Sequence, residues 1–161
     1  LEFSPTMLCL ILAGKVGSNV ASEIGSMRVT EQIDALEIMG VNSANFLILP
    51  KIIAAIFFFP FLVIISMSIG MLGGWFGSIS VDVTTADFLY GLKYQFNPFY
   101  VTYALTKTIV FAFIITSVSS FYGYTTKGGA LEVGVSSTRA VVYSSVVVLI
   151  FNFILTQLLL A

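Results

Sequence analysis

Four long apolar stretches alternate with three shorter polar ones along the chain. The apolar stretches cover residues 1–25, 50–81, 99–122 and 139–161, and the polar ones cover residues 27–40, 82–98 and 123–138. A membrane-spanning helix needs about 20 mostly apolar residues to cross a bilayer core of about 30 Å. The pattern therefore predicts an all-α polytopic membrane protein, a single domain with four transmembrane helices.

The first polar stretch has the pattern of an amphipathic helix. Val29, Ile33 and Leu36 share one face at helical spacing, and charged side chains cover most of the remaining surface. Thr30 ahead of Glu31 is a plausible start, because a hydroxyl caps free amides and an acid suits a helix N-terminus. We therefore expect one short amphipathic helix between the first two spans.

Composition agrees with a membrane protein. The chain is 58% apolar and only 9% charged, with a mean hydropathy of +1.02, whereas about 25% of residues are charged in soluble domains. The net charge of −1 does not suggest nucleic acid as a partner. Cys9 is the single cysteine, which excludes an intramolecular disulfide. Because Leu1 stands where an initiator Met would, we expect the chain to be a fragment that lacks its natural N-terminus.

The basic residues predict the orientation in the membrane. Those that flank the first and third polar stretches are Arg28, Lys51, Lys127 and Arg139. The stretch at 82–98 holds only Lys93. The positive-inside rule therefore places residues 27–40 and 123–138 in the cytoplasm and residues 82–98 outside.

Small residues recur at helical spacing in two of the spans, where they would let another helix approach closely. The candidates for such packing are Gly14, Gly17, Ala21, Gly25, Gly70 and Gly74. A polar stripe of Lys15, Asn19 and Glu23 runs along the first of these helices. Two interpretations stay open for it: pairing near the cytoplasmic surface, or a polar wall of a transport path.

Lys107 is a charged residue well inside the third span. A charge at that depth costs a few kcal/mol on insertion scales, so it normally faces a cavity or a partner. The alternative is that the side chain snorkels to the outer interface beside Tyr100 and Tyr103. A lysine in an apolar cavity would suit an anionic amphiphile, so Lys107 is a candidate lipid ligand.

The sequence does not support an enzyme. It contains no His, no Cys pair, no phosphate-binding Gly-x-x-x-x-Gly-Lys motif and no Gly-x-Ser-x-Gly elbow, so we expect no catalytic, metal or cofactor site. Energy for transport would come from a partner or from an ion gradient. The amphipathic stretch carries one Arg against several acids, which favours docking to a protein over lying on anionic lipid.

The same stretch carries a family resemblance. Residues Gly14–Val41, GKVGSNVASEIGSMRVTEQIDALEIMGV, closely resemble the signature of MlaE-type (MlaE/YrbE) permeases, the membrane subunits of ABC transporters that move lipids. Further matches lie at Pro50–Ala54, from Lys107 to Gly123, at Gly129–Gly134 and at Thr138–Val142. One departure is Asn152, where the family often has Asp.

The resemblance implies a function and partners. Residues 27–40 would be the coupling helix, which sits in a groove of the ATPase subunit. The permease would work as a homodimer with an ABC ATPase and an MCE-domain lipid-binding protein, moving phospholipid. It would lie in the bacterial inner membrane, with the plastid inner envelope as the alternative. A gradient-driven carrier that uses intramembrane charges remains the rival function.

The resemblance and the amphipathic pattern together name the site residues. Those expected to couple to the ATPase are Arg28, Val29, Glu31, Ile33, Asp34, Leu36 and Glu37. Lys107 and Glu2 are expected to line the lipid site, Glu2 because it matches the glutamate of the family's Arg-Glu-Leu-Gly-Pro motif.

Overall fold

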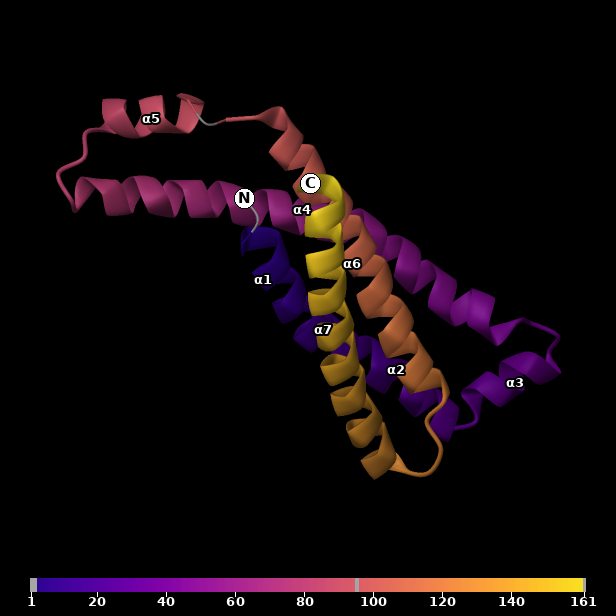
Figure 1. Cartoon of the computed structure of the whole chain (residues 1–161). Coiled ribbons are helices and arrows are strands. Elements are labelled where there is room, and N and C mark those ends of the chain that lie inside the picture. Colours follow the sequence, from indigo (N-terminus) through magenta and orange to yellow (C-terminus); the bar gives the residue numbers. More distant parts are fainter. Residues whose placement is uncertain (1–2, 95, 161) are drawn as a thin grey trace.

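The computed structural model describes residues 3–94 and 96–160, and every secondary-structure element in them is helical. The long helices are α1 (Phe3–Leu12), which continues through a π-helical turn η1 (Ala13–Gly17) into α2 (Ser18–Val29), α4 (Ser43–Ile79), α6 (Pro98–Tyr124) and α7 (Ala130–Leu160). Two short helices, α3 (Gln32–Ile38) and α5 (Thr85–Tyr94), join them at opposite ends of the molecule (Figure 1).

Four of these helical segments are long and apolar enough to cross a membrane, as the sequence predicts. They are Phe3–Val29, Ser43–Ile79, Pro98–Tyr124 and Ala130–Leu159. Figure 1 shows α6 and α7 side by side, with α1 and α2 behind them and α4 crossing the bundle. The chain is therefore a multi-pass membrane protein.

Helix α6 lies at the centre of the bundle and contributes more buried residues than any other element. Phe111 and Ile115 of α6 pack in one apolar core with Cys9, Phe59 and Val148 from the other three spans. By contrast, the last third of α4, after Met67, extends beyond this core, and α5 folds back along it (Figure 1). We call this region the α5 end of the molecule and the opposite one the α3 end.

The expected helix over residues 27–40 is two helices in the structure. α2 continues to Val29, and the Thr30 hydroxyl donates a hydrogen bond of 2.8 Å to the carbonyl of Ser26 in the preceding turn. Glu31 then adopts a left-handed conformation, with φ of 59°, which turns the chain before α3. Thr30 thus ends one helix rather than starting the next, so the expected start was wrong.

Two spans begin earlier than their apolar stretches. α4 starts at Ser43 rather than 50, because the Asn42 side chain accepts a hydrogen bond of 3.2 Å from the Asn45 amide and caps the helix. α7 starts at Ala130 rather than 139, directly after the turn at Gly128, which has φ of +119°. The first turns of α4 and α7 contain polar side chains. They lie at the α3 end, outside the apolar stretches that would cross the membrane. The 82–98 stretch is partly helical, since it contains α5.

The small residues fall into two groups. A methyl group on Gly17 of η1 would approach Ser119 Oγ of α6 to 2.9 Å. One on Gly123 would approach the carbonyl of Ala21 to 2.7 Å, so the backbones of α2 and α6 touch there. One on Gly25 would lie 3.3 Å from Thr126 Oγ1. By contrast, methyl groups on Gly14 and Gly70 would meet nothing within 4 Å, and one on Gly74 would meet only Phe88 of α5.

Candidate functional site

Three oxygen atoms from three different helices meet at the α3 end. Glu37 Oε1, from α3, accepts hydrogen bonds from Ser43 Oγ at 2.9 Å and from Tyr124 Oη at 3.0 Å. The two hydroxyls are themselves 3.0 Å apart. Ser43 belongs to the first turn of α4 and Tyr124 is the last residue of α6. We call this arrangement the Glu37 triangle; it ties α3 to two membrane spans.

The triangle holds Glu37 in its charged form. Hydrogen bonds from Ser43 and then from Tyr124 lower the pKa of the Glu37 carboxyl below its ordinary value of 4.5, because both donors favour the carboxylate. Glu37 is nevertheless an exposed residue. The α3 end therefore carries an ionised, doubly hydrogen-bonded carboxylate at neutral pH.

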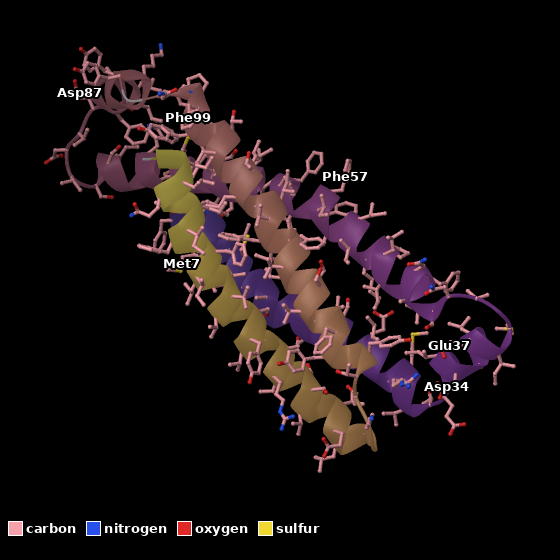
Figure 2. The ribbon with its side chains drawn as sticks, turned by 45° about the vertical axis from the view of Figure 1, so that its right-hand side comes forward. Met7, Asp34, Glu37, Phe57, Asp87 and Phe99 are labelled. Carbon is pink, nitrogen blue, oxygen red and sulfur yellow. The ribbon has the colours of Figure 1, made fainter. Side chains whose placement is uncertain are left out.

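Arg28 of α2 also contacts α3, close to the Glu37 triangle. Its guanidinium forms an ion pair of 2.8 Å with Asp34 of α3 and lies 5.5 Å from the centre of the Tyr124 ring. The Arg28 and Asp34 side chains are partly exposed, so the pair itself contributes little to stability. Its role is to fix where α3 lies relative to α2 and α6. Figure 2 shows Asp34 and Glu37 together at this end of the molecule.

The apolar strip predicted for docking points inward at its centre. Ile33 is 0% exposed and packs with Val20 and Ile24 of α2, while Leu36 is half-buried. The apolar side chains that α3 presents outward are instead Ile38, 87% exposed, and Met39, 68% exposed. Both lie within the predicted helix but off its predicted strip. Helical periodicity alone does not show which face packs against the chain's own core.

The remaining expected coupling residues lie around α3. Val29 is half-buried at the end of α2. Glu31 is exposed at the turn between α2 and α3. Nearby, Glu23 of the polar stripe forms a 2.6 Å ion pair with Lys51 of α4, while Lys15 and Asn19 are exposed. Glu23 thus pairs with a neighbouring helix, one of the two interpretations that the sequence leaves open.

Lys107 lies in a polar cluster inside the bundle. Its side chain is 0% exposed, and Nζ donates to Tyr103 Oη at 2.9 Å and to Thr156 Oγ1 at 3.0 Å. The Thr156 hydroxyl in turn donates a hydrogen bond of 2.7 Å to the backbone carbonyl of Asn152. The Asn152 side-chain oxygen accepts one of 2.9 Å from the Thr6 hydroxyl. The snorkelling interpretation is therefore wrong for this structure, because hydroxyls of α6 and α7 hold the ammonium inside.

A cavity of about 960 Å³ opens next to this cluster at the α5 end. Its walls are mostly apolar and come from α4, α5 and α6, with Ser4 of α1 at the edge. Ligand pockets usually measure about 300–1,000 Å³, so this one can hold a large ligand. Tyr103 links the two features, since it lines the cavity and its hydroxyl contacts Lys107.

Sequence reasoning identified Lys107 and named Tyr103 as a neighbour, but missed Thr156 as a partner. Tyr103 is four residues before Lys107, one turn earlier on the same helix face. No comparable signal exists for Thr156, which reaches Lys107 only through tertiary packing. Glu2, the other expected lipid ligand, lies outside the described residues. Within residues 3–94 and 96–160, no group of three or more metal-ligating side chains could hold a metal ion.

The fold and these features define a multi-pass α-helical membrane protein with a side-chain-fastened helix at one end and an apolar cavity at the other. The chain belongs to the MlaE permease family, because the sequence profile described as "Permease MlaE" matches residues 1–158.

Similar proteins span bacteria and chloroplasts. A probable ABC transporter permease protein of Rickettsia bellii is 42% identical over 98% of this chain, which covers 61% of that protein. One of Synechocystis is 38% identical over 98% of this chain and 60% of its own length. The chloroplastic protein Trigalactosyldiacylglycerol 1 of Arabidopsis thaliana is 35% identical over 97% of this chain, which covers 45% of that protein. The chain thus spans about three-fifths of the length of its bacterial relatives.

Proposed function

We propose that this chain is the permease subunit of an ABC transporter that moves phospholipid or a related lipid between membranes, driven by a separate ATPase subunit that binds α3. Family membership supports the transporter class, since the relatives are named as ABC transporter permeases. The observation that carries the coupling role is the fastening of α3 to α2, α4 and α6 by Arg28 and the Glu37 triangle. A force on α3 would reach three spans through these contacts.

The docking surface that we propose is the outward side of α3. Helix-in-groove binding uses exposed apolar anchors for affinity and flanking charges for register. Ile38 and Met39 supply the anchors, and the exposed Glu31 and Asp34 supply the charges. Ile33 acts behind this surface by seating α3 on α2, so an acidic substitution there would damage the fold as well as the interface.

The cargo that suits the α5 end is an amphiphile with an anionic headgroup. Acyl chains would lie against the apolar walls of the cavity, and a phosphate would be attracted to the nearby Lys107 ammonium. The Arabidopsis relative bears the name of a galactosylated diacylglycerol, which favours a lipid cargo. Glu2 remains a proposed second residue of this lipid site.

The assembly that we propose contains a second copy of this chain, an ABC ATPase and an MCE-domain protein in a bacterial inner membrane. We expect α3 to lie in the cytoplasm, where ATP is, because the basic residues Arg28, Lys51 and Lys127 gather at the α3 end. The chloroplastic relative makes the plastid inner envelope the alternative location.

The test of docking is the double substitution Ile38→Asp, Met39→Asp in the full-length protein, purified from its native membrane with a tag. We expect the ATPase subunit to be lost from the preparation while the permease stays in the membrane. Leu131→Asp is the matched control, because Leu131 is 82% exposed at the start of α7, also at the α3 end. Full recovery of the ATPase with the double variant would contradict docking at α3.

A further inference from the structure

We propose that Tyr124 is the positioning residue through which movement of α3 reaches α6 and, along α6, the cavity at the α5 end. The inference rests on the proposed function, because it assumes that an ATPase subunit displaces α3. It goes beyond that function by assigning the transmission to one hydroxyl group and one helix.

Tyr124 contacts three other helices with one side chain. Its ring lies below Arg28 of α2, and its hydroxyl meets Glu37 of α3 and Ser43 of α4. It also packs against the apolar cluster around Ile33, which seats α3. Tyr124 is thus the residue of α6 that forms polar contacts with α3, among the described hydrogen bonds and ion pairs.

Left-handed residues bound α3 on both sides, so it can move as a unit. Glu31 has φ of 59° before it and Gly40 has φ of +78° after it. Such residues interrupt the helical backbone, and side-chain contacts therefore set the position of α3. Removing one contact would change how α3 movement is shared among α2, α4 and α6.

The hydrogen bonds of the Glu37 triangle can be separated by substitution. The three oxygen–oxygen contacts share two hydroxyl protons, one from Ser43 and one from Tyr124. Because the Glu37 carboxylate is the strongest acceptor, both hydroxyls donate to it. Tyr124→Phe would leave the Ser43 bond to Glu37 and the Arg28 pair to Asp34. Polar attachment to α6 would be lost, while attachment to α2 and α4 would stay.

Helix α6 is a direct mechanical route to the cavity. It runs without a break from Pro98 to Tyr124, about 40 Å at the usual helical rise. Figure 2 shows its first turn, marked by Phe99, at the opposite end from Glu37. Tyr103 and Lys107 lie on the same helix near the cavity. A displacement at Tyr124 would therefore be carried to the cavity wall by one rigid element.

The experiment measures the labelled lipid moved per ATP hydrolysed. The full-length complex, purified with its co-purifying subunits, is placed in vesicles of phosphatidylethanolamine and phosphatidylglycerol that contain a trace of fluorescent phosphatidylglycerol. For Tyr124→Phe we expect ATPase recovery and basal ATP hydrolysis close to those of the unmodified complex. The lipid-to-ATP ratio should fall about fivefold or more, the lower end of typical coupling between sites.

A control variant separates this route from general damage. Tyr122→Phe removes a hydroxyl from the same end of α6, but Tyr122 stacks on Tyr143 of α7. This variant should keep the lipid-to-ATP ratio within about twofold of the unmodified complex, which is below typical coupling.

Each result decides the inference. An unchanged ratio for Tyr124→Phe would overturn it, as would loss of the ATPase subunit from that variant, since Tyr124 would then support docking alone. An equal fall for Tyr122→Phe would also overturn it, because loss of another hydroxyl at the same end of α6 would then have the same effect. An unmodified complex that binds no ATPase or moves no lipid would instead refute the proposed function, and this inference with it.

Discussion

The Lys107 ammonium lies 2.9 Å from the hydroxyl of Tyr103, whose side chain lines the cavity at the α5 end. The buried Lys107 side chain thus lies directly behind the wall of this mostly apolar cavity. Charged groups inside membrane spans are costly and usually serve a function. Because Lys107 lies directly behind Tyr103 in the cavity wall, it is the first residue to test.

Lys107→Met should lower the amount of phospholipid that co-purifies with the complex. The substitution keeps the length of the side chain and removes its charge, so an anionic headgroup loses its electrostatic attraction to the cavity. We expect about tenfold weaker binding, equivalent to about 1.4 kcal/mol. Mass spectrometry of the purified complex, titrated with phosphatidylglycerol, measures the change.

Lys93→Met is the control for this prediction. Lys93 is an exposed residue of α5, close to the cavity, so the substitution removes the same charge at the same end of the molecule. Phospholipid binding by the Lys93→Met complex should stay close to that of the unmodified complex. Equal loss in both variants would mean that net charge, and not the Lys107 position, attracts the lipid.

Glu37 should make the stability of the protein depend on pH. Its hydrogen bonds lower the pKa in the folded state, so its ionised form stabilises the fold at pH values above the ordinary pKa of 4.5. That contribution is lost as the pH falls through the lowered folded-state pKa. The Tm of the unmodified protein should therefore exceed that of Glu37→Gln at pH 7, and the difference should shrink below about pH 4.5.

Melting curves of both proteins from pH 7 to about pH 3.5 test this prediction. Glu132→Gln serves as the control, since Glu132 is exposed in the first turn of α7. Its Tm should follow that of the unmodified protein at every pH. A constant difference between Glu37→Gln and the unmodified protein would show that ionisation of Glu37 does not stabilise the fold.

Gly123→Ala should destabilise the contact between α2 and α6. The added methyl group would lie 2.7 Å from the carbonyl oxygen of Ala21, which is backbone and cannot move aside without shifting α2. Overpacking of this kind costs about 1–3 kcal/mol. Gly73→Ala is the matched control, because its methyl group would meet nothing within 4 Å and Ala favours a helix. Unfolding in a denaturing detergent, followed by circular dichroism, should rank Gly123→Ala as clearly the less stable variant.

Sequence reasoning predicted the four spans because each depends on local composition alone. The break between α2 and α3 was missed, since residues 27–40 keep one helical period and only the observed φ of Glu31 reveals the turn. Tertiary packing also determines which way the amphipathic strip faces. Periodicity predicted that Ile33 lies on an apolar face, and in the structure that face packs against Val20 and Ile24.

The candidate site shows the same division. Lys107 stands out in the sequence because a charge interrupts an apolar run, which is a local signal. Its burial depends on Thr156, which is 49 residues further along the chain, and no local pattern relates the two. Likewise, Gly17 and Gly14 look alike as small residues, but only Gly17 faces α6 and α7 closely, because the neighbours of each come from other helices.

We propose that ATP hydrolysis by a partner subunit drives lipid movement through this protein. The most direct test reconstitutes the full-length complex in vesicles with fluorescent phosphatidylglycerol and follows lipid movement with ATP, with a non-hydrolysable analogue and with an uncoupler. We predict movement that requires ATP hydrolysis, stops with the analogue and continues with the uncoupler. Lipid movement that continues with the non-hydrolysable analogue and stops with the uncoupler would contradict ATP-driven transport and identify a gradient-driven carrier.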